Sequence, residues 1–117
     1  MRTLDTFTRA YLECALWSST GDDDQPLDRD HDITDIADES VAKAIADCAA
    51  FRDKAGDMLA DWCDDDAGHD FWLTRNGHGA GFWSRLNKSH GHLLSDLAQK
   101  AGQSDPYIGD DGRIYLS

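Results

Sequence analysis

The chain has 117 residues, of which 40% are hydrophobic, so it can bury one hydrophobic core but not two. Its formal net charge of −12 argues against direct binding to nucleic acid or to an anionic membrane, because both would repel it. No apolar run approaches the roughly 20 residues that a membrane-spanning helix needs, and the first residues do not resemble a signal peptide. We therefore expect a single domain over residues 1–117 that stays in the cytoplasm.

The negative charge is concentrated in one part of the sequence. From Asp22 to Asp70 there are 17 acidic and 4 basic residues, whereas the rest of the chain has 6 acidic and 7 basic residues. A surface with this much unbalanced charge attracts basic groups. The sequence thus predicts a basic protein surface as the partner, and it does not indicate the oligomeric state.

The three cysteines, Cys14, Cys48 and Cys63, are odd in number and show no C-x-x-C spacing. Each falls where the helical pattern favours an apolar residue. We therefore expect reduced thiols in the core rather than a disulfide framework or a metal site.

The first half of the chain reads as two helices separated by an acidic loop. Apolar residues recur at three- and four-residue steps over residues 3–18, which predicts an amphipathic helix with Thr3 as its N-cap. Residues 21–37 are rich in Asp and predict a loop, with one helical turn at residues 33–37. The apolar residues of the segment from about 40 to 62 keep to one side at 100° per residue, which predicts a long helix.

Four aspartates of this second predicted helix share its polar side. Asp53, Asp57, Asp61 and Asp64 lie at roughly 120° to 200° from Val41, so they form a narrow acidic stripe. The stripe is expected to face solvent or a partner, and packing of the opposite side has to stabilise the helix against the repulsion between like charges.

The second half of the chain predicts two β-hairpins with a helix between them. Aromatic runs at residues 71–74 and 81–84 flank the turn dipeptide Asn76-Gly77, and residues 107–109 and 113–116 flank Asp110-Asp111-Gly112. A short helix is expected over residues 91–101, with Leu93, Leu94, Leu97 and Ala98 facing inward and Gly102 as its stop. The fold class is therefore α+β, with two or three helices packed on a small antiparallel sheet of two β-hairpins.

The segment GHDFWLTRNGHGAGFW, residues 68–83, resembles the signature of a family of small bacteriophage proteins of uncharacterised function. The residues ALWS at 15–18 and GDDGRIY at 109–115 are similar to the opening and closing motifs of that family. The resemblance implies a phage protein in the cytoplasm of a host cell. Small acidic phage proteins often inhibit host machinery, including defence nucleases, so it also favours an inhibitor.

Several patterns resemble sites without completing one. Asp28, Asp30, Asp32 and Glu39 have the spacing of an EF-hand calcium loop, but the sixth position, which requires Gly, is Ile33. The five histidines match no zinc spacing, and the Gly-rich stretch at 75–81 lies between two expected strands rather than before a helix. Cys63 with His69, or Ser84 with His78 and Asp70, could form a nucleophile and base, at spacings no better than chance. We predict no metal, no cofactor and no catalytic residue.

Two functions compete. The first is a non-enzymatic inhibitor that binds a basic host protein, such as a nucleic-acid-binding defence factor, by imitating nucleic acid in the manner of an anti-CRISPR or anti-restriction protein. Its predicted acidic face consists of Asp28, Asp30, Asp32, Asp53, Asp57, Asp61, Asp64 and Asp65. The second is a small-ligand- or metal-binding enzyme that uses the aromatic hairpin. The residues of that alternative site are Asp70, Trp72, Arg75, His78 and Trp83, with His69 beside them. A structural component of a virion is a third hypothesis, for which the sequence has no coiled coil or repeat.

Overall fold

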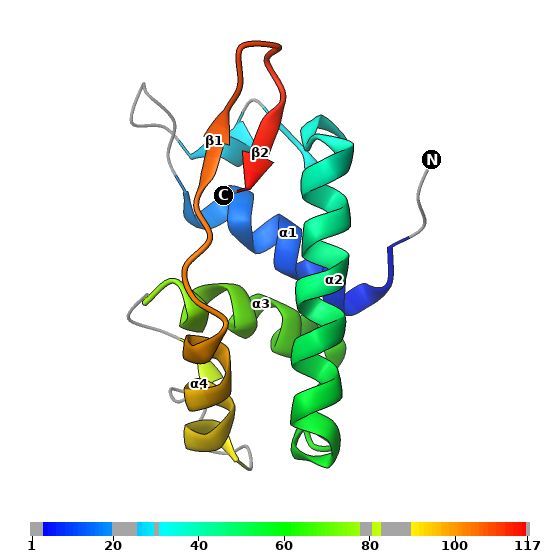
Figure 1. Cartoon of the computed structure of the whole chain (residues 1–117), viewed down its shortest axis with the longest axis vertical. Coiled ribbons are helices and arrows are strands. Elements are labelled where there is room, and N and C mark those ends of the chain that lie inside the picture. The colour runs from blue at the N-terminus through cyan, green and yellow to red at the C-terminus, as the bar shows by residue number, and fades with distance from the viewer. Residues whose placement is uncertain (1–3, 20–25, 30, 78–80, 83–89, 117) are drawn as a thin grey trace.

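The computed structural model describes residues 4–19, 26–29, 31–77, 81–82 and 90–116. Its α-helices are α1 (Thr6–Ser18), α2 (Asp38–Ala55), α3 (Asp64–Arg75) and α4 (Gly91–Lys100). Three short 3₁₀ helices, η1 (Leu27–Arg29), η2 (Ile33–Asp35) and η3 (Gly56–Leu59), lie between them, and strands β1 (Pro106–Ile108) and β2 (Ile114–Leu116) form an antiparallel hairpin. In Figure 1, α2 runs along the longest axis, the hairpin and α4 lie toward opposite ends, and α1 and α3 cross between them.

Helix α1 begins two residues later than predicted, because its N-cap is not Thr3. Its N-cap is Asp5, whose side chain accepts a 2.8 Å hydrogen bond from the amide of Thr8. The predicted N-cap, Thr3, lies outside the described residues. Aspartate is as good an N-cap as threonine, because its carboxylate also complements the positive end of the helix dipole.

Helix α2 is shorter than the sequence predicted. It ends at Ala55, because Gly56 adopts a φ of 51° and a 3₁₀ turn follows. The prediction of one helix from about residue 40 to 62 is therefore wrong beyond Ala55. The apolar residue Trp62 is nevertheless buried, since the turn brings it back against Phe82 with ring centroids 5.1 Å apart.

Helix α3 occupies the segment in which a first β-hairpin was predicted, so that prediction is wrong for residues 71–75. Three aspartates in its first turn favour a helix start there. The dipeptide Asn76-Gly77 ends the helix instead of turning a hairpin: the Asn76 side chain donates to the Trp72 carbonyl, and Gly77 has a φ of 72°. The remaining residues of the predicted hairpin, except Gly81 and Phe82, lie outside the described part of the chain.

The packing of α3 against α1 depends on a small residue. A Cβ atom placed on Gly68 would lie 2.1 Å from the carbonyl oxygen of Phe7, so the two helix backbones are in direct contact there. This close approach brings Tyr11 onto Phe71 and Trp72, with ring centroids 5.3 Å apart in both pairs. Phe51 of α2 also stacks on Phe71, with ring centroids 4.2 Å apart, which completes an aromatic centre shared by three helices.

The predicted C-terminal elements are confirmed. Helix α4 ends before Gly102, whose φ is 81°, and its Leu94 and Ala98 are fully buried; Leu93, expected to face inward, is instead 56% exposed. In the hairpin, Tyr107 pairs with Tyr115. Strand β2 is tied to the start of α2, because the Leu116 amide donates to the Ser40 hydroxyl at 3.0 Å.

The architecture is α+β, as the sequence predicted, but with four α-helices and a single two-stranded sheet among the described residues. The prediction of two or three helices on two hairpins is wrong in both numbers for one reason. The second half of α3 is buried without a break from Asp70 to Arg75, so its short apolar run, Phe71-Trp72-Leu73, shows no helical periodicity and cannot be told from a buried strand. None of the described helices is both long and apolar enough to span a membrane.

Candidate binding site

The predicted acidic face is divided between separate parts of the molecule. Asp28 lies in η1 and Asp32 precedes η2, near the hairpin end of the longest axis, whereas Asp53 and Asp57 lie near the opposite end of α2 (Figure 1). The other described members of the predicted face are Asp61, in the turn after η3, and Asp64 and Asp65, in the first turn of α3. All seven are exposed, and Asp30 lies outside the described residues.

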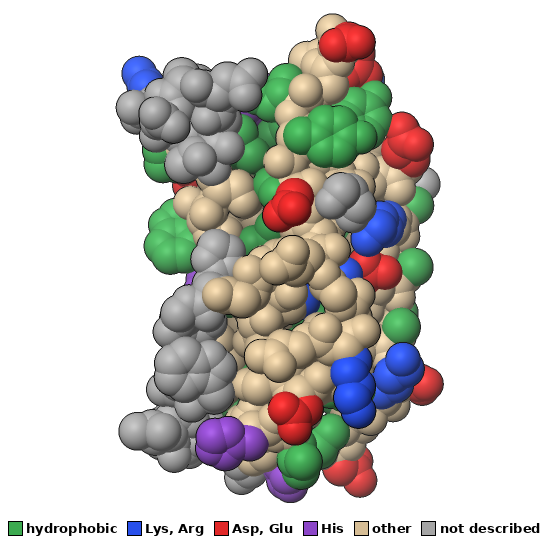
Figure 2. Space-filling view, turned by 60° about the vertical axis from the view of Figure 1, so that its left-hand side comes forward, with side chains coloured by type: hydrophobic (Ala, Val, Ile, Leu, Met, Phe, Trp, Pro, Cys, Tyr) green, Lys and Arg blue, Asp and Glu red, His purple; other side chains and the backbone are tan. Residues whose placement is uncertain are grey.

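The break at Gly56 is the reason that the four-aspartate stripe does not form on one helix. Only Asp53 belongs to α2, while Asp57, Asp61 and Asp64 follow the break. Figure 2 shows the face that carries α4 and the hairpin, where acidic side chains stand apart from one another with Lys and Arg among them.

Two other carboxylates, Asp47 of the acidic segment and Asp5 outside it, are paired with cations within the chain. Asp47 accepts from Lys43 and from Arg75, both at 2.9 Å, and Arg52 reaches Asp5 at 2.7 Å. Burial acts to raise the pKa of Asp47, but these two cations outweigh it and hold the pKa below its ordinary value. These carboxylates stabilise the fold and are therefore poor candidates for a partner.

The calcium-like spacing does not assemble into a site. Asp32 is the N-cap of η2 and accepts hydrogen bonds from the amide and hydroxyl of Thr34, while Glu39 lies in the first turn of α2. Within the described ranges, no three His, Cys, Asp or Glu side chains are grouped so that they could hold a metal ion.

Arg75, a member of the alternative site, is buried at a junction of helices. Its guanidinium donates to the Tyr11 hydroxyl at 2.9 Å, to the Asp47 carboxylate at 2.9 Å, and to the carbonyls of Ala101 and Gly102 at 3.1 and 2.7 Å. It also lies 5.4 Å from the centre of the Phe71 ring. Arg75 therefore joins α1, α2 and the end of α4 to α3, and it is not open to a ligand.

The other described members of the alternative site are buried too. Trp72 is 1% exposed and donates its indole N–H to the Ser18 hydroxyl at 2.9 Å. Asp70 is 2% exposed, with the His69 ring nitrogen Nδ1 3.4 Å from its Oδ1 atom. His78, Trp83 and Ser84 lie outside the described residues. The structure thus places the described part of this predicted site in the core.

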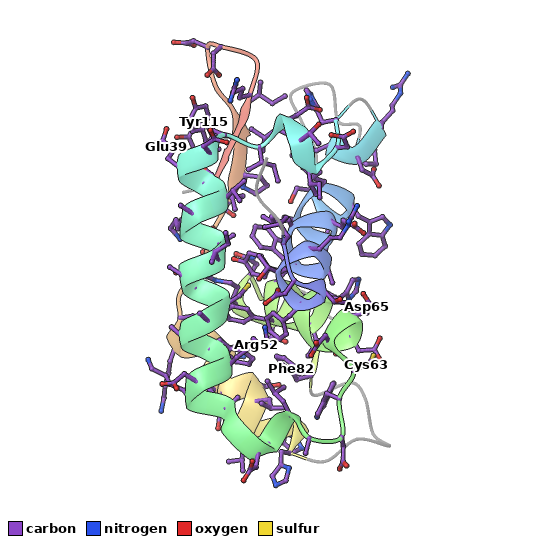
Figure 3. The ribbon with its side chains drawn as sticks, turned by 90° about the vertical axis from the view of Figure 1, so that its right-hand side faces the viewer. Glu39, Arg52, Cys63, Asp65, Phe82 and Tyr115 are labelled. Carbon is purple, nitrogen blue, oxygen red and sulfur yellow. The ribbon has the colours of Figure 1, made fainter. Side chains whose placement is uncertain are left out.

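A pocket of about 530 Å³ lies between α1, η1 and α3, and we call it the Trp17 pocket. From α1 it is lined by Ala10, Glu13, Cys14 and Trp17; the last three lie three, four and seven residues after Ala10, so all four share one face of the helix. Its other lining residues are Asp28 of η1 and Asp65, Asp66 and His69 of α3. Asp28 and Asp65, two of the predicted binding residues, are therefore brought together. In Figure 3, Asp65 and Cys63 point outward from the start of α3, on the side away from α2.

The Trp17 pocket combines an aromatic wall, a neutral floor and an acidic rim. Trp17 is 59% exposed and lies against the His69 ring with centroids 5.7 Å apart. Burial raises the pKa of the Cys14 thiol to about 12, so the floor carries no charge near neutral pH. The sequence analysis did not identify Trp17 as a binding residue. Its position off the side of α1 that carries the inward residues was a signal that could have identified it.

A second pocket, of about 610 Å³, shares Glu13 and Asp28 with the Trp17 pocket. Its floor is largely apolar, with Leu16, Ile33 and Val41 among its lining residues. Because Glu13 and Asp28 line both pockets, their charges act on both.

A scan against protein-family models, a search of curated proteins and a search of solved structures each found no match.

Proposed function

We propose that the chain is a non-enzymatic binding protein that engages a basic protein surface through the Trp17 pocket. The observation that carries this proposal is the meeting of an exposed indole, Trp17, with the exposed carboxylates of Asp28 and Asp65 in one pocket. Exposed aromatic side chains are enriched where proteins bind one another, and unpaired carboxylates attract cationic partners.

The enzymatic alternative receives less support. The side chains of Arg75 and Trp72 are buried and hydrogen-bonded within the core, so two of the five residues of the alternative site are not available to a substrate. The net charge of the chain also favours the proposed function, since a charge of −12 speeds encounter with a basic surface.

The resemblance of residues 68–83 to small phage proteins favours a host protein as that partner. Proteins that bind nucleic acid present basic surfaces, so a nuclease of a CRISPR or restriction system is a partner of the expected chemistry. In this proposal the carboxylates around the Trp17 pocket occupy the groups with which the partner binds phosphate, and the protein acts as an inhibitor in the host cytoplasm.

The test compares two double variants of equal charge. One is Asp28→Asn with Asp65→Asn, which neutralises the pocket, and the other is Asp53→Asn with Asp57→Asn, near the far end of α2. Each immobilised chain is incubated with host lysate at low and high salt, and each captured basic protein is then purified and its affinity for the three chains is measured.

The pocket variant is expected to bind the purified partner at least tenfold more weakly, and the control variant is expected to bind like the parent chain. Equal loss in both variants would show that only overall charge matters. Loss in the Asp53 and Asp57 variant alone would place the binding surface at the end of α2, as the predicted stripe required.

A further inference from the structure

The structure contains two arginines that lie between an aromatic ring and a carboxylate. The Arg52 guanidinium is 5.0 Å from the centre of the Phe7 ring and pairs with Asp5 at 2.7 Å. Arg75 is 5.4 Å from the centre of the Phe71 ring and pairs with Asp47 at 2.9 Å. A guanidinium suits this arrangement because it is planar, stacks on rings and forms directed hydrogen bonds to carboxylates.

The Trp17 pocket presents the same two kinds of group at the surface. Trp17 supplies the ring, and Asp65, from the adjoining turn of α3, supplies an exposed carboxylate. Indole is the best of the aromatic rings at attracting a cation. The floor formed by Ala10 and Cys14 is neutral and suits the aliphatic part of a long cationic side chain.

One carboxylate of the pocket already accepts a guanidinium. Arg9 lies 3.0 Å from Glu13, and both side chains are about 60% exposed, at 62% and 59%. A pair this exposed contributes little to stability. Glu13 can therefore exchange Arg9 for an arginine of a partner at small cost.

We propose that the Trp17 pocket binds a single arginine side chain of the partner, with the guanidinium stacked on the Trp17 indole and paired with the carboxylates of the rim. This inference rests on the proposed function and specifies the residue that the basic partner inserts. It also sets a preference for arginine over lysine, because the lysine ammonium is compact, strongly hydrated and unable to stack.

The probes are three blocked pentapeptides that have arginine, lysine or citrulline at the centre of four glycines. Citrulline matches arginine in shape and has no charge. Each peptide is titrated into the ¹⁵N-labelled full chain, and the indole N–H signal of Trp17, assigned by its loss in Trp17→Phe, is followed by NMR. The arginine peptide is expected to shift this signal saturably and to bind about fivefold more tightly than the lysine peptide. The citrulline peptide is expected to leave it unshifted.

Trp17→Leu tests the role of the ring, with Tyr107→Leu as a matched control because Tyr107 is an aromatic residue of similar exposure, 54%, on β1. Trp17→Leu has no indole signal at position 17, so binding to both variants is followed by the backbone amide signals of the other pocket residues. The preference for arginine is expected to vanish in Trp17→Leu and to persist in Tyr107→Leu. Urea denaturation of both variants verifies that they fold. Equal binding of arginine and lysine by the parent chain, or an arginine preference that survives in Trp17→Leu, would overturn the inference.

The two proposals can fail separately. If Asp28→Asn with Asp65→Asn abolishes binding of the basic partner while the parent chain binds arginine and lysine peptides equally, the proposed function stands and the arginine pocket is wrong. If the arginine peptide saturates the Trp17 signal while that variant still binds the partner, the arginine pocket stands and the proposed function is wrong.

Discussion

The guanidinium of Arg75 donates a 2.9 Å hydrogen bond to the hydroxyl of Tyr11, inside the protein and across 64 positions of sequence. Burial acts to lower the pKa of Arg75, but Tyr11 and Asp47 outweigh it and raise the pKa, so the group stays charged. Arg75 donates four hydrogen bonds and lies over the Phe71 ring, so it holds the helices together and is not a reactive group.

Removing the Arg75 guanidinium should strongly destabilise the protein. In Arg75→Met the Asp47 carboxylate, the Tyr11 hydroxyl and two carbonyls lose a partner, and we expect a loss of about 3–5 kcal/mol in the free energy of unfolding. Arg9→Met, which breaks an exposed pair, should cost at most about 1 kcal/mol. Urea denaturation followed by circular dichroism measures both, and equal losses would contradict the assignment.

A methyl group at Gly68 should force α1 and α3 apart. The added Cβ would lie 2.1 Å from the Phe7 carbonyl oxygen, which is backbone and cannot rotate away, so Gly68→Ala should cost about 3 kcal/mol or more. Gly102→Ala is the control, because its Cβ meets open space and only its φ of 81° is unfavourable, at about 1–2 kcal/mol. Thermal denaturation should show the larger fall in Tm for Gly68→Ala; the opposite order would refute the close contact.

Stability should fall in acid partly through Asp47. Its folded-state pKa lies below the ordinary value, so its contribution is complete above the unfolded pKa of about 3.9 and is lost as the pH falls through the lower folded value. Urea midpoints measured between pH 6 and pH 2.5 should therefore fall less steeply below pH 4 in Asp47→Asn than in the parent chain.

The three thiols should differ in reactivity. Cys14 and Cys48 are buried, and burial raises the pKa of each to about 12, so both should resist a thiol reagent in the folded protein. Cys63 is exposed before α3 and should react at once. Mass spectrometry after a short maleimide pulse should find one label per chain, and three in urea. Labelling of Cys14 in the folded state would contradict its burial.

The parts of the fold that the sequence predicted correctly have strong local signals. Helices α1 and α4 show apolar residues on one side, and the hairpin has Asp110-Asp111-Gly112 between two β-favouring runs. Burial of Cys14 and Cys48 was also predicted correctly, but Cys63 is exposed, because it precedes α3 instead of continuing the long helix.

The parts that were wrong depend on contacts between distant segments. Gly56 could end a helix or be tolerated inside one, and the end of the helix at this glycine goes with the packing of Trp62 against Phe82, a contact that is distant in the sequence. Phe71 and Trp72 favour a strand locally, but burial against Tyr11 and Phe51 outweighs that preference. Trp17 was not identified as a binding residue: its position off the inward side of α1 indicated an exposed ring, but the pocket beside it depends on where α3 and η1 lie.

The link between β2 and the start of α2 affects how the chain folds during its synthesis. The amide of Ala37 donates to the carbonyl of Ile114, and Ser40 accepts from Leu116, which is made 76 positions later, so the beginning of α2 is bound to residues that are made much later. Ile114 is fully buried, so this strand must leave the ribosome before the hydrophobic core around Ile36 and Val41 can close. Until then the nascent chain exposes Ile36 and Val41 to chaperones and proteases.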